Sequence, residues 1–164
     1  MNNVIDRIVN EGRRLETDAL YSYKGHFNAA DNLDCWHYKL GISAAIGSVL
    51  ASAALFAKLG GAWLYVGAVC GLLAAVIGGV STFIDANKKA NLHREAAGHY
   101  KYLRDRARVL CEIKCVAGLS ESDLIIELEN LQNDSADFSK TYPVIPKKAY
   151  EKAKAGIELG EANY

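Results

Sequence analysis

The sequence has no surplus of charge of either sign, because its 164 residues include 19 basic and 19 acidic side chains. A protein that binds nucleic acid through general phosphate contacts needs an excess of lysine and arginine to neutralise the phosphates. The balance therefore predicts that nucleic acid is not a partner of this protein.

The sequence also lacks the familiar catalytic patterns: a glycine-rich phosphate loop, two histidines with a glutamate on one helix, and a nucleophile elbow. Cys111 and Cys115 lie four residues apart on an expected helix, but a zinc site needs two more ligands at a suitable spacing. We interpret them as small buried thiols, and we expect Cys35 and Cys70 to be unpaired too, because none of the four would meet an oxidising compartment. No enzyme, metal or cofactor is expected.

Charge is missing from two long stretches, residues 40–57 and 59–84, which are separated only by Lys58. About 20 apolar residues in a helix are enough to cross the hydrocarbon core of a bilayer. Residues 40–84 therefore predict a helical hairpin that crosses a membrane twice. The alternative is a buried hairpin in a soluble helical protein, but the rest of the chain is too short and too polar to surround it. Because the hairpin follows a charged segment, it is not expected to be a signal peptide.

Basic residues are concentrated on both outer flanks of this hairpin. The positive-inside rule therefore places both termini in the cytoplasm. The turn is expected at residues 58–62, where two glycines suit a tight connection, with Trp63 and Tyr65 at the membrane interface.

The flanking segments, residues 1–39 and 85–164, are expected to be cytoplasmic and helical, which makes the whole fold all-α. Before the hairpin, residues recur at steps of three and four, as in an amphipathic helix: Ile5, Ile8, Gly12, Leu15, Ala19, Ser22, His26, Ala29, Leu33, Trp36 and Leu40. A similar stripe follows the hairpin: Leu92, Ala96, His99, Leu103, Ala107, Leu110, Ile113 and Ala117. The two stripes are expected to pair as an antiparallel stalk.

Glycine and proline mark the expected ends of the helices in the second flank. No proline lies between Ile84 and Gly118, so the second span is expected to continue as one helix to about Ala117. Gly118 is expected to end that helix. Ser120 is expected to cap the next helix, and Pro146 to begin the last one.

Small residues recur every four positions in the second span, which allows helix backbones to approach closely in lipid. The stripe consists of Gly67, Gly71, Ala75 and Gly79. We interpret it as a packing surface within the hairpin and between subunits; the alternative is packing within the hairpin alone. In the first span the candidate pore-lining residues are Ser43, Gly47, Ser48 and Ser52, and acidic residues at a candidate pore mouth are Asp31, Asp34 and Asp85.

Four histidines, His26, His37, His93 and His99, all lie on expected helices. A hydrogen-bonded histidine in a core or an interface is the simpler interpretation. A pH sensor is the sharper alternative, because imidazole titrates near neutral pH.

Several of these segments, in this order and spacing, resemble the SLATT family of two-span effectors, which occurs beside nucleotide-second-messenger systems in bacterial conflict loci. The segments are His26-Phe27-Asn28-Ala29-Ala30, Leu40 to Ser48, His93 to Leu103, and Pro143-x-x-Pro146-x-x-x-Tyr150. The resemblance implies an all-helical effector of antiviral defence that forms pores in the bacterial inner membrane during abortive infection. It implies no catalytic residues, and no fused sensor domain is expected in this sequence.

The leading hypothesis is therefore a pore-forming effector in the lipid bilayer, which acts as an ion channel. Two helices cannot enclose a channel, so a homo-oligomer is required, with Leu50 or Leu55 as a hydrophobic gate. An upstream nucleotide-signalling or sensor protein is a possible partner. The alternative is a non-conducting scaffold whose cytoplasmic helices recruit a partner. A transporter subunit is disfavoured because no charged residue lies in mid-membrane.

Overall fold

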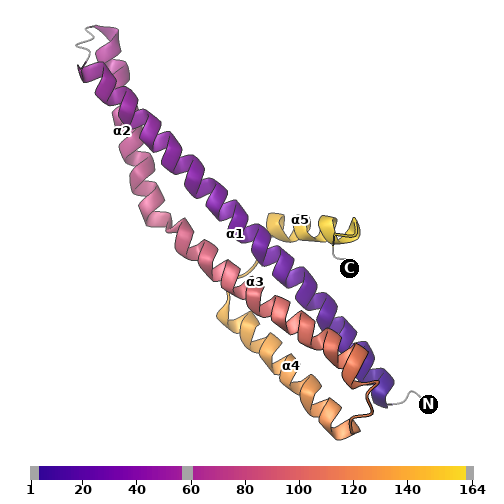
Figure 1. The fold of residues 1–164 in the computed structure, drawn as a ribbon. Helices are drawn as coiled ribbons and strands as arrows, with labels where there is room; N and C mark the ends of the chain where they lie inside the picture. Colours follow the sequence, from indigo (N-terminus) through magenta and orange to yellow (C-terminus); the bar gives the residue numbers. More distant parts are fainter. Residues whose placement is uncertain (1–3, 57–60, 162–164) are drawn as a thin grey trace. The chain divides into compact units, whose positions relative to one another are not determined.

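The computed structural model describes residues 4–56 and 61–161, without the side chains of residues 55, 56, 83 and 84. Within these ranges the chain is helical and contains no strand, which confirms the all-α prediction. The helices are α1 (Val4–Phe56), α2 (Ala62–Ile84), α3 (Ala86–Val109), the short π-helix η1 (Leu110–Lys114), α4 (Glu121–Thr141) and α5 (Lys147–Glu158) (Figure 1). The expected turn at residues 58–62 lies mostly outside the described residues.

The helices form two compact units. The bundle unit comprises Met1–Ala30 and Asn91–Tyr164, and the hairpin unit comprises Asp31–Ala90. The expected division at residues 39/40 and 84/85 concerns the membrane boundary and stays a prediction, whereas the units reflect packing.

The core of the bundle unit lies between the first part of α1, α3 and α4, which run side by side in Figure 1. Four leucines are almost completely buried there: Leu103, Leu110, Leu124 and Leu131. Each contributes about 1.5–3 kcal/mol of hydrophobic stabilisation. Ile8, Leu15 and Ala19 of α1 complete this core, so the expected α1 stripe is buried over these positions.

The boundaries of α4 and α5 agree with the signals in the sequence. Gly118 adopts a φ of 79°, a left-handed conformation that glycine tolerates well. Ser120 caps α4 by accepting a hydrogen bond from the backbone N–H of Asp123 at 3.2 Å. Pro146 directly precedes α5. The predictions for Ser120 and Pro146 are confirmed, whereas the helix expected to end at Gly118 ends at Lys114, with Cys115 as its C-cap, and residues 115–118 form a turn.

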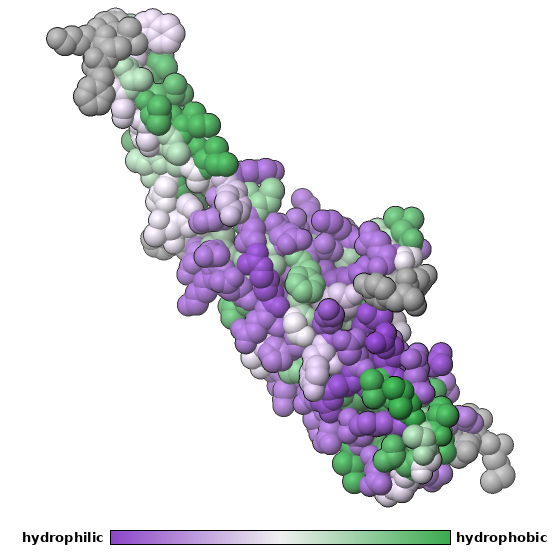
Figure 2. All heavy atoms as spheres, viewed as in Figure 1, coloured by the Kyte–Doolittle hydropathy of each residue, from purple (hydrophilic) through white to green (hydrophobic). Residues whose placement is uncertain are grey.

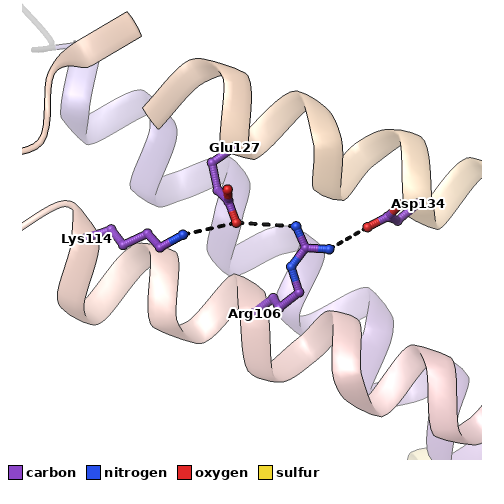
Figure 3. A network of polar contacts seen from close by, with 4 residues as sticks. All are labelled: Arg106, Lys114, Glu127 and Asp134. Atoms are coloured by element: carbon purple, nitrogen blue, oxygen red, sulfur yellow. Dashed lines mark hydrogen bonds and ion pairs between the residues drawn. The ribbon is translucent and has the colours of Figure 1, made fainter. Parts of the chain in front are cut away.

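Ion pairs hold α4 against α3 and η1 (Figure 3). Arg106 reaches Asp134 at 2.6 Å and Glu127 at 3.3 Å, and Lys114 reaches Glu127 at 3.2 Å. Burial alone would raise the pKa of Glu127, but the hydrogen bonds from Lys114 and Arg106 outweigh it and lower that pKa. The network therefore favours the ionised carboxylate.

The register of α3 differs from the expected stripe. Leu92, His99, Ile113 and Ala117 are exposed, and so is Trp36 at the end of the α1 stripe. The buried residues on the side that faces α1 recur at steps of four and three instead: His93, Ala97, Tyr100, Arg104, Ala107 and Cys111. A second buried face is formed by Ala96 and Leu103 of α3 and by Leu110 of η1, and its two leucines belong to the core with α4. The α3 helix has two buried faces because it lies between α1 and α4 (Figure 1).

The expected continuous helix from the second span to Ala117 is broken at Asp85 and ends at Lys114. Asp85 adopts a left-handed conformation with φ 43° and ψ 52°, which ends α2. Its side chain accepts a hydrogen bond from the backbone N–H of Lys88 at 3.4 Å, so the same residue caps the start of α3. An aspartate tolerates this conformation better than most residues, because its short side chain bonds locally.

The hairpin unit pairs the second part of α1 with α2. Among the described residues, one helical stretch, from Ala62 onward, is long and apolar enough to cross a membrane. The first expected span does not meet this criterion within the described part of the chain. Its described portion contains Gly41, Ser43 and Gly47, which lower its hydropathy, and the uncharged stretch continues into residues 55–57, whose side chains are not described.

Candidate functional site

The small residues of the hairpin unit bring α1 and α2 into close contact. A Cβ atom added to Gly67 would lie 2.6 Å from the Cβ of Ala54, and one added to Gly71 would lie 3.3 Å from the Cβ of Ala51. From the other side, a Cβ on Gly47 would lie 3.1 Å from the Cβ of Ala74. Larger side chains at these glycines would force the helices apart.

The stripe expected on α2 is divided between two faces of that helix. Gly67 and Gly71 face α1, whereas Ala75 and Gly79 are exposed, and a Cβ on Gly79 would meet no atom within 4 Å. The first pair therefore serves packing within the hairpin. The second pair leaves a small-residue surface available on the outside of α2.

The candidate pore-lining residues also fall on different faces. Ser48 and Ser52 are exposed, and their hydroxyls donate to the carbonyls of Ala44 and Ser48, each at 2.9 Å. Ser43 is exposed but lies about 140° around the helix from Ser48, at about 100° per residue. Gly47 packs against α2. Ser48 and Ser52 thus form the hydroxyl-bearing face, with their hydrogen bonds satisfied in apolar surroundings.

The three acidic residues of the candidate pore mouth differ in their surroundings. Asp31 is exposed, Asp34 is half-buried, and Asp85 is exposed with its side chain at the start of α3. Asp85 therefore has a structural role whether or not it faces a pore.

The outer surface of α2 is strongly apolar. Its large exposed side chains are Trp63, Leu64, Tyr65, Val66, Val69, Leu72, Leu73, Val76 and Val80. Only 11% of the most apolar 18-residue stretch of this helix is buried within the chain. Figure 2 shows a green, apolar surface on the upper arm of the molecule, which the second part of α1 and α2 form together. Such a surface is unfavourable in water and favourable in hydrocarbon.

A buried histidine pair links α1 to α3 in the bundle unit. His26 Nδ1 and His93 Nδ1 lie 2.8 Å apart, so one donates a hydrogen bond to the other. The ring of Tyr100 stacks on His26 with centroids 5.5 Å apart. Burial, and secondarily the charge on His93, lowers the pKa of His26 to about 4, and burial lowers that of His93. Both rings are therefore neutral at pH 7.

The other two histidines and the thiols differ in their surroundings. His99 is exposed and stacks on Tyr142 with ring centroids 5.6 Å apart, and His37 is exposed in the hairpin unit. Burial raises the pKa of Cys111 to about 11, and its Sγ lies 3.6 Å from the carbonyl oxygen of Val9. Across the described residues, no group of three or more metal-binding side chains comes together.

Sequence reasoning missed the role of His93, Tyr100 and Arg104 as buried partners of α1. The signal that could have found them is the strict four-three spacing from His93 to Cys111, which becomes visible once polar side chains are allowed in the stripe.

A protein-family model described as "SMODS and SLOG-associating 2TM effector domain family 4" matches residues 13–163. No curated protein and no solved structure matches the chain.

Proposed function

The chain belongs to the SLATT family of two-transmembrane effector domains, and from this premise we propose that it forms a homo-oligomeric pore in the bacterial inner membrane. The family associates with SMODS and SLOG proteins, which gives the protein a general role as an effector in conflict systems. The observation that carries the proposal is the apolar outer surface of α2, which the described part of the chain leaves uncovered.

Both spans cross the bilayer in this proposal. Exposed Ile42, Ile46, Val49 and Leu50 support the first crossing, since α1 presents these large side chains away from the chain itself. The lysines on both flanks of the hairpin support cytoplasmic termini.

A pore requires several copies, because two helices cannot surround a lumen. The exposed small residues Ala75 and Gly79 are suited to contact between copies, since they allow helices to approach closely. Ser48 and Ser52 then face the lumen, where hydroxyls are tolerated by water. Of the two gate candidates, Leu50 lies about 160° around α1 from Ser48 and does not share its face, and the side chain of Leu55 lies outside the described residues.

Ion flux from liposomes tests the proposal. Purified protein should release a trapped ion, and expression in a bacterium should depolarise the inner membrane. Ser48→Leu should reduce the flux at unchanged protein level, whereas Ser43→Leu, the same change on another face of α1, should have the smaller effect. If no flux occurs under any condition and expression leaves the membrane potential unchanged, the pore proposal fails.

The alternative function, a membrane-anchored scaffold, is favoured by exposed aliphatic side chains at the junction of η1 and α4. These residues are Ile113, Val116, Leu119, Ile125 and Ile126. A scaffold would show unchanged membrane potential on expression, but would lose its cellular effect when Ile126 is replaced by glutamate. A pore would retain liposome flux in that variant.

A further inference from the structure

A hollow of about 390 Å³ in the bundle unit combines basic and aromatic side chains. The α1 helix contributes two rings and α3 contributes four charged residues to its lining: Tyr23, Phe27, Lys101, Arg104, Asp105 and Arg108. None of these residues belongs to the hairpin on which the pore proposal rests.

Helix geometry explains why these residues meet. Lys101, Arg104 and Arg108 follow one another at steps of three and four, so they share one face of α3. Tyr23 and Phe27 are four residues apart on α1, with ring centroids 6.2 Å apart in an edge-to-face arrangement. The hollow thus has a cationic wall and an aromatic wall.

Arg104 carries a buried charge that the protein does not fully compensate. It is only 9% exposed, and its Nε has no hydrogen-bond partner within the described structure. Glu16 forms a long ion pair with that nitrogen at 3.9 Å, which is beyond hydrogen-bond distance. The guanidinium lies 5.9 Å from the centre of the Tyr23 ring. Arginine does not lose its charge in proteins, so an additional anion beside it would be stabilised.

The two other cations of the hollow, unlike Arg104, have no ion-pair partner among the described residues. Lys101 and Arg108 form no ion pair with any residue that the structure describes, in contrast to Arg106 on the opposite side of α3, which pairs with Glu127 and Asp134. Asp105 is the single acidic side chain of the lining. The lining therefore carries three positive charges against one negative charge.

We propose that this hollow binds a soluble small molecule that carries both a phosphate group and a planar ring, the chemistry of a nucleotide. Guanidinium and ammonium groups are the usual partners of phosphate. The exposed ring of Phe27 beside Tyr23 offers a face for stacking, as in other sites that bind nucleobases. A volume of about 390 Å³ lies within the range of small-molecule sites. Because the walls come from α1 and α3, the bound ligand would connect these two helices.

Binding to the full-length protein in nanodiscs of neutral phosphatidylcholine tests the proposal by calorimetry. The probes are AMP and GMP, with inorganic phosphate and adenosine as the two halves of the ligand. At least one nucleotide should bind saturably and more tightly than either half, and the affinity should fall as salt is raised.

Variants of exposed residues separate the two walls. Lys101→Gln combined with Arg108→Gln should weaken nucleotide binding about tenfold or more, because two charge-assisted contacts are lost. Phe27→Leu should weaken nucleotide binding roughly fivefold and leave phosphate binding nearly unchanged. Lys140→Gln, which removes an exposed cation outside the hollow, is the matched control and should bind as the wild type does.

Three results would overturn the proposal: no saturable binding of any probe at millimolar concentration, binding that Lys101→Gln with Arg108→Gln leaves unchanged, or binding of phosphate with no gain from the ring. Nanodiscs with anionic lipid provide the remaining arm. The nucleotide proposal fails if nucleotide binds only in nanodiscs without anionic lipid and if binding of the anionic lipid itself requires Lys101 and Arg108. The hollow would then be a site for lipid headgroups. Binding does not depend on conductance, so this test and the test of the pore fail separately.

Discussion

Acidification should destabilise the bundle unit through the buried histidine pair. A proton on either ring of His26 and His93 would place a charge in a site that is almost closed to water, since His26 is 3% exposed. The pKa of His26 lies below its ordinary value, so the unfolded chain binds a proton more readily than the folded chain. The stabilisation that depends on a neutral His26 is therefore fully present above about pH 7 and is lost as the pH falls toward 4.

The size of the effect follows from the two pKa values of His26. With 6.5 in the unfolded chain and about 4 in the folded chain, proton linkage gives a loss of about 2 kcal/mol at pH 5 and about 3 kcal/mol at still lower pH. The lowered pKa of His93 acts in the same direction. A loss of 2 kcal/mol corresponds to a decrease in Tm of roughly 5–10 °C.

Thermal unfolding of the full chain in detergent at pH 8 and pH 5 measures this loss. His26→Asn keeps a polar group near the position of Nδ1 but cannot titrate, so its Tm should depend less on pH than that of the wild type. His37→Asn, at an exposed position, is the control and should retain the wild-type dependence. Carboxylates such as Glu127 also titrate, so the difference between variants is the informative quantity. An equal pH dependence in His26→Asn and wild type would refute the reasoning.

Three further predictions concern packing and topology. Gly67→Leu should disrupt the hairpin itself, because the leucine side chain would collide with α1. Gly79→Leu should leave the monomer intact and reduce the oligomer size measured by native mass spectrometry. An unchanged size would count against Ala75 and Gly79 as a contact between copies. Leu131→Ala should cost about 2–5 kcal/mol in chemical denaturation, since this side chain is fully buried, and a loss below 1 kcal/mol would contradict its place in the core. A cysteine at position 60 should react with an impermeant reagent from outside intact cells, and reaction only after lysis would reject the topology.

The sequence predicted the helical segments and the starts of α4 and α5, because Ser120 and Pro146 carry local signals that need no tertiary context. It did not predict the break at Asp85, since a left-handed aspartate inside a helical pattern has no distinctive signal.

The register of α3 was missed for a different reason. His93, Tyr100 and Arg104 are polar enough to suggest a solvated face, yet each is buried against α1, where His26 and Tyr23 provide partners. A periodicity judged only by apolar residues cannot locate a face that is stabilised by a histidine pair and a cation–π contact. For the same reason the basic hollow on α3 could not be predicted, because its rings come from α1.

The packing of Cys111 against α1 has a kinetic consequence. With a pKa of about 11, only about one thiol in ten thousand is ionised at pH 7, and the thiolate is the form that attacks alkylating reagents. The position is also closed, since a Cβ on Gly12 would lie 2.5 Å from its Sγ. Cys35, which is exposed, is thus the site where reagents act first. The rate at which Cys111 is alkylated therefore measures how often α1 separates from the helix that carries this thiol, because Cys111 reacts only in molecules where that contact has opened.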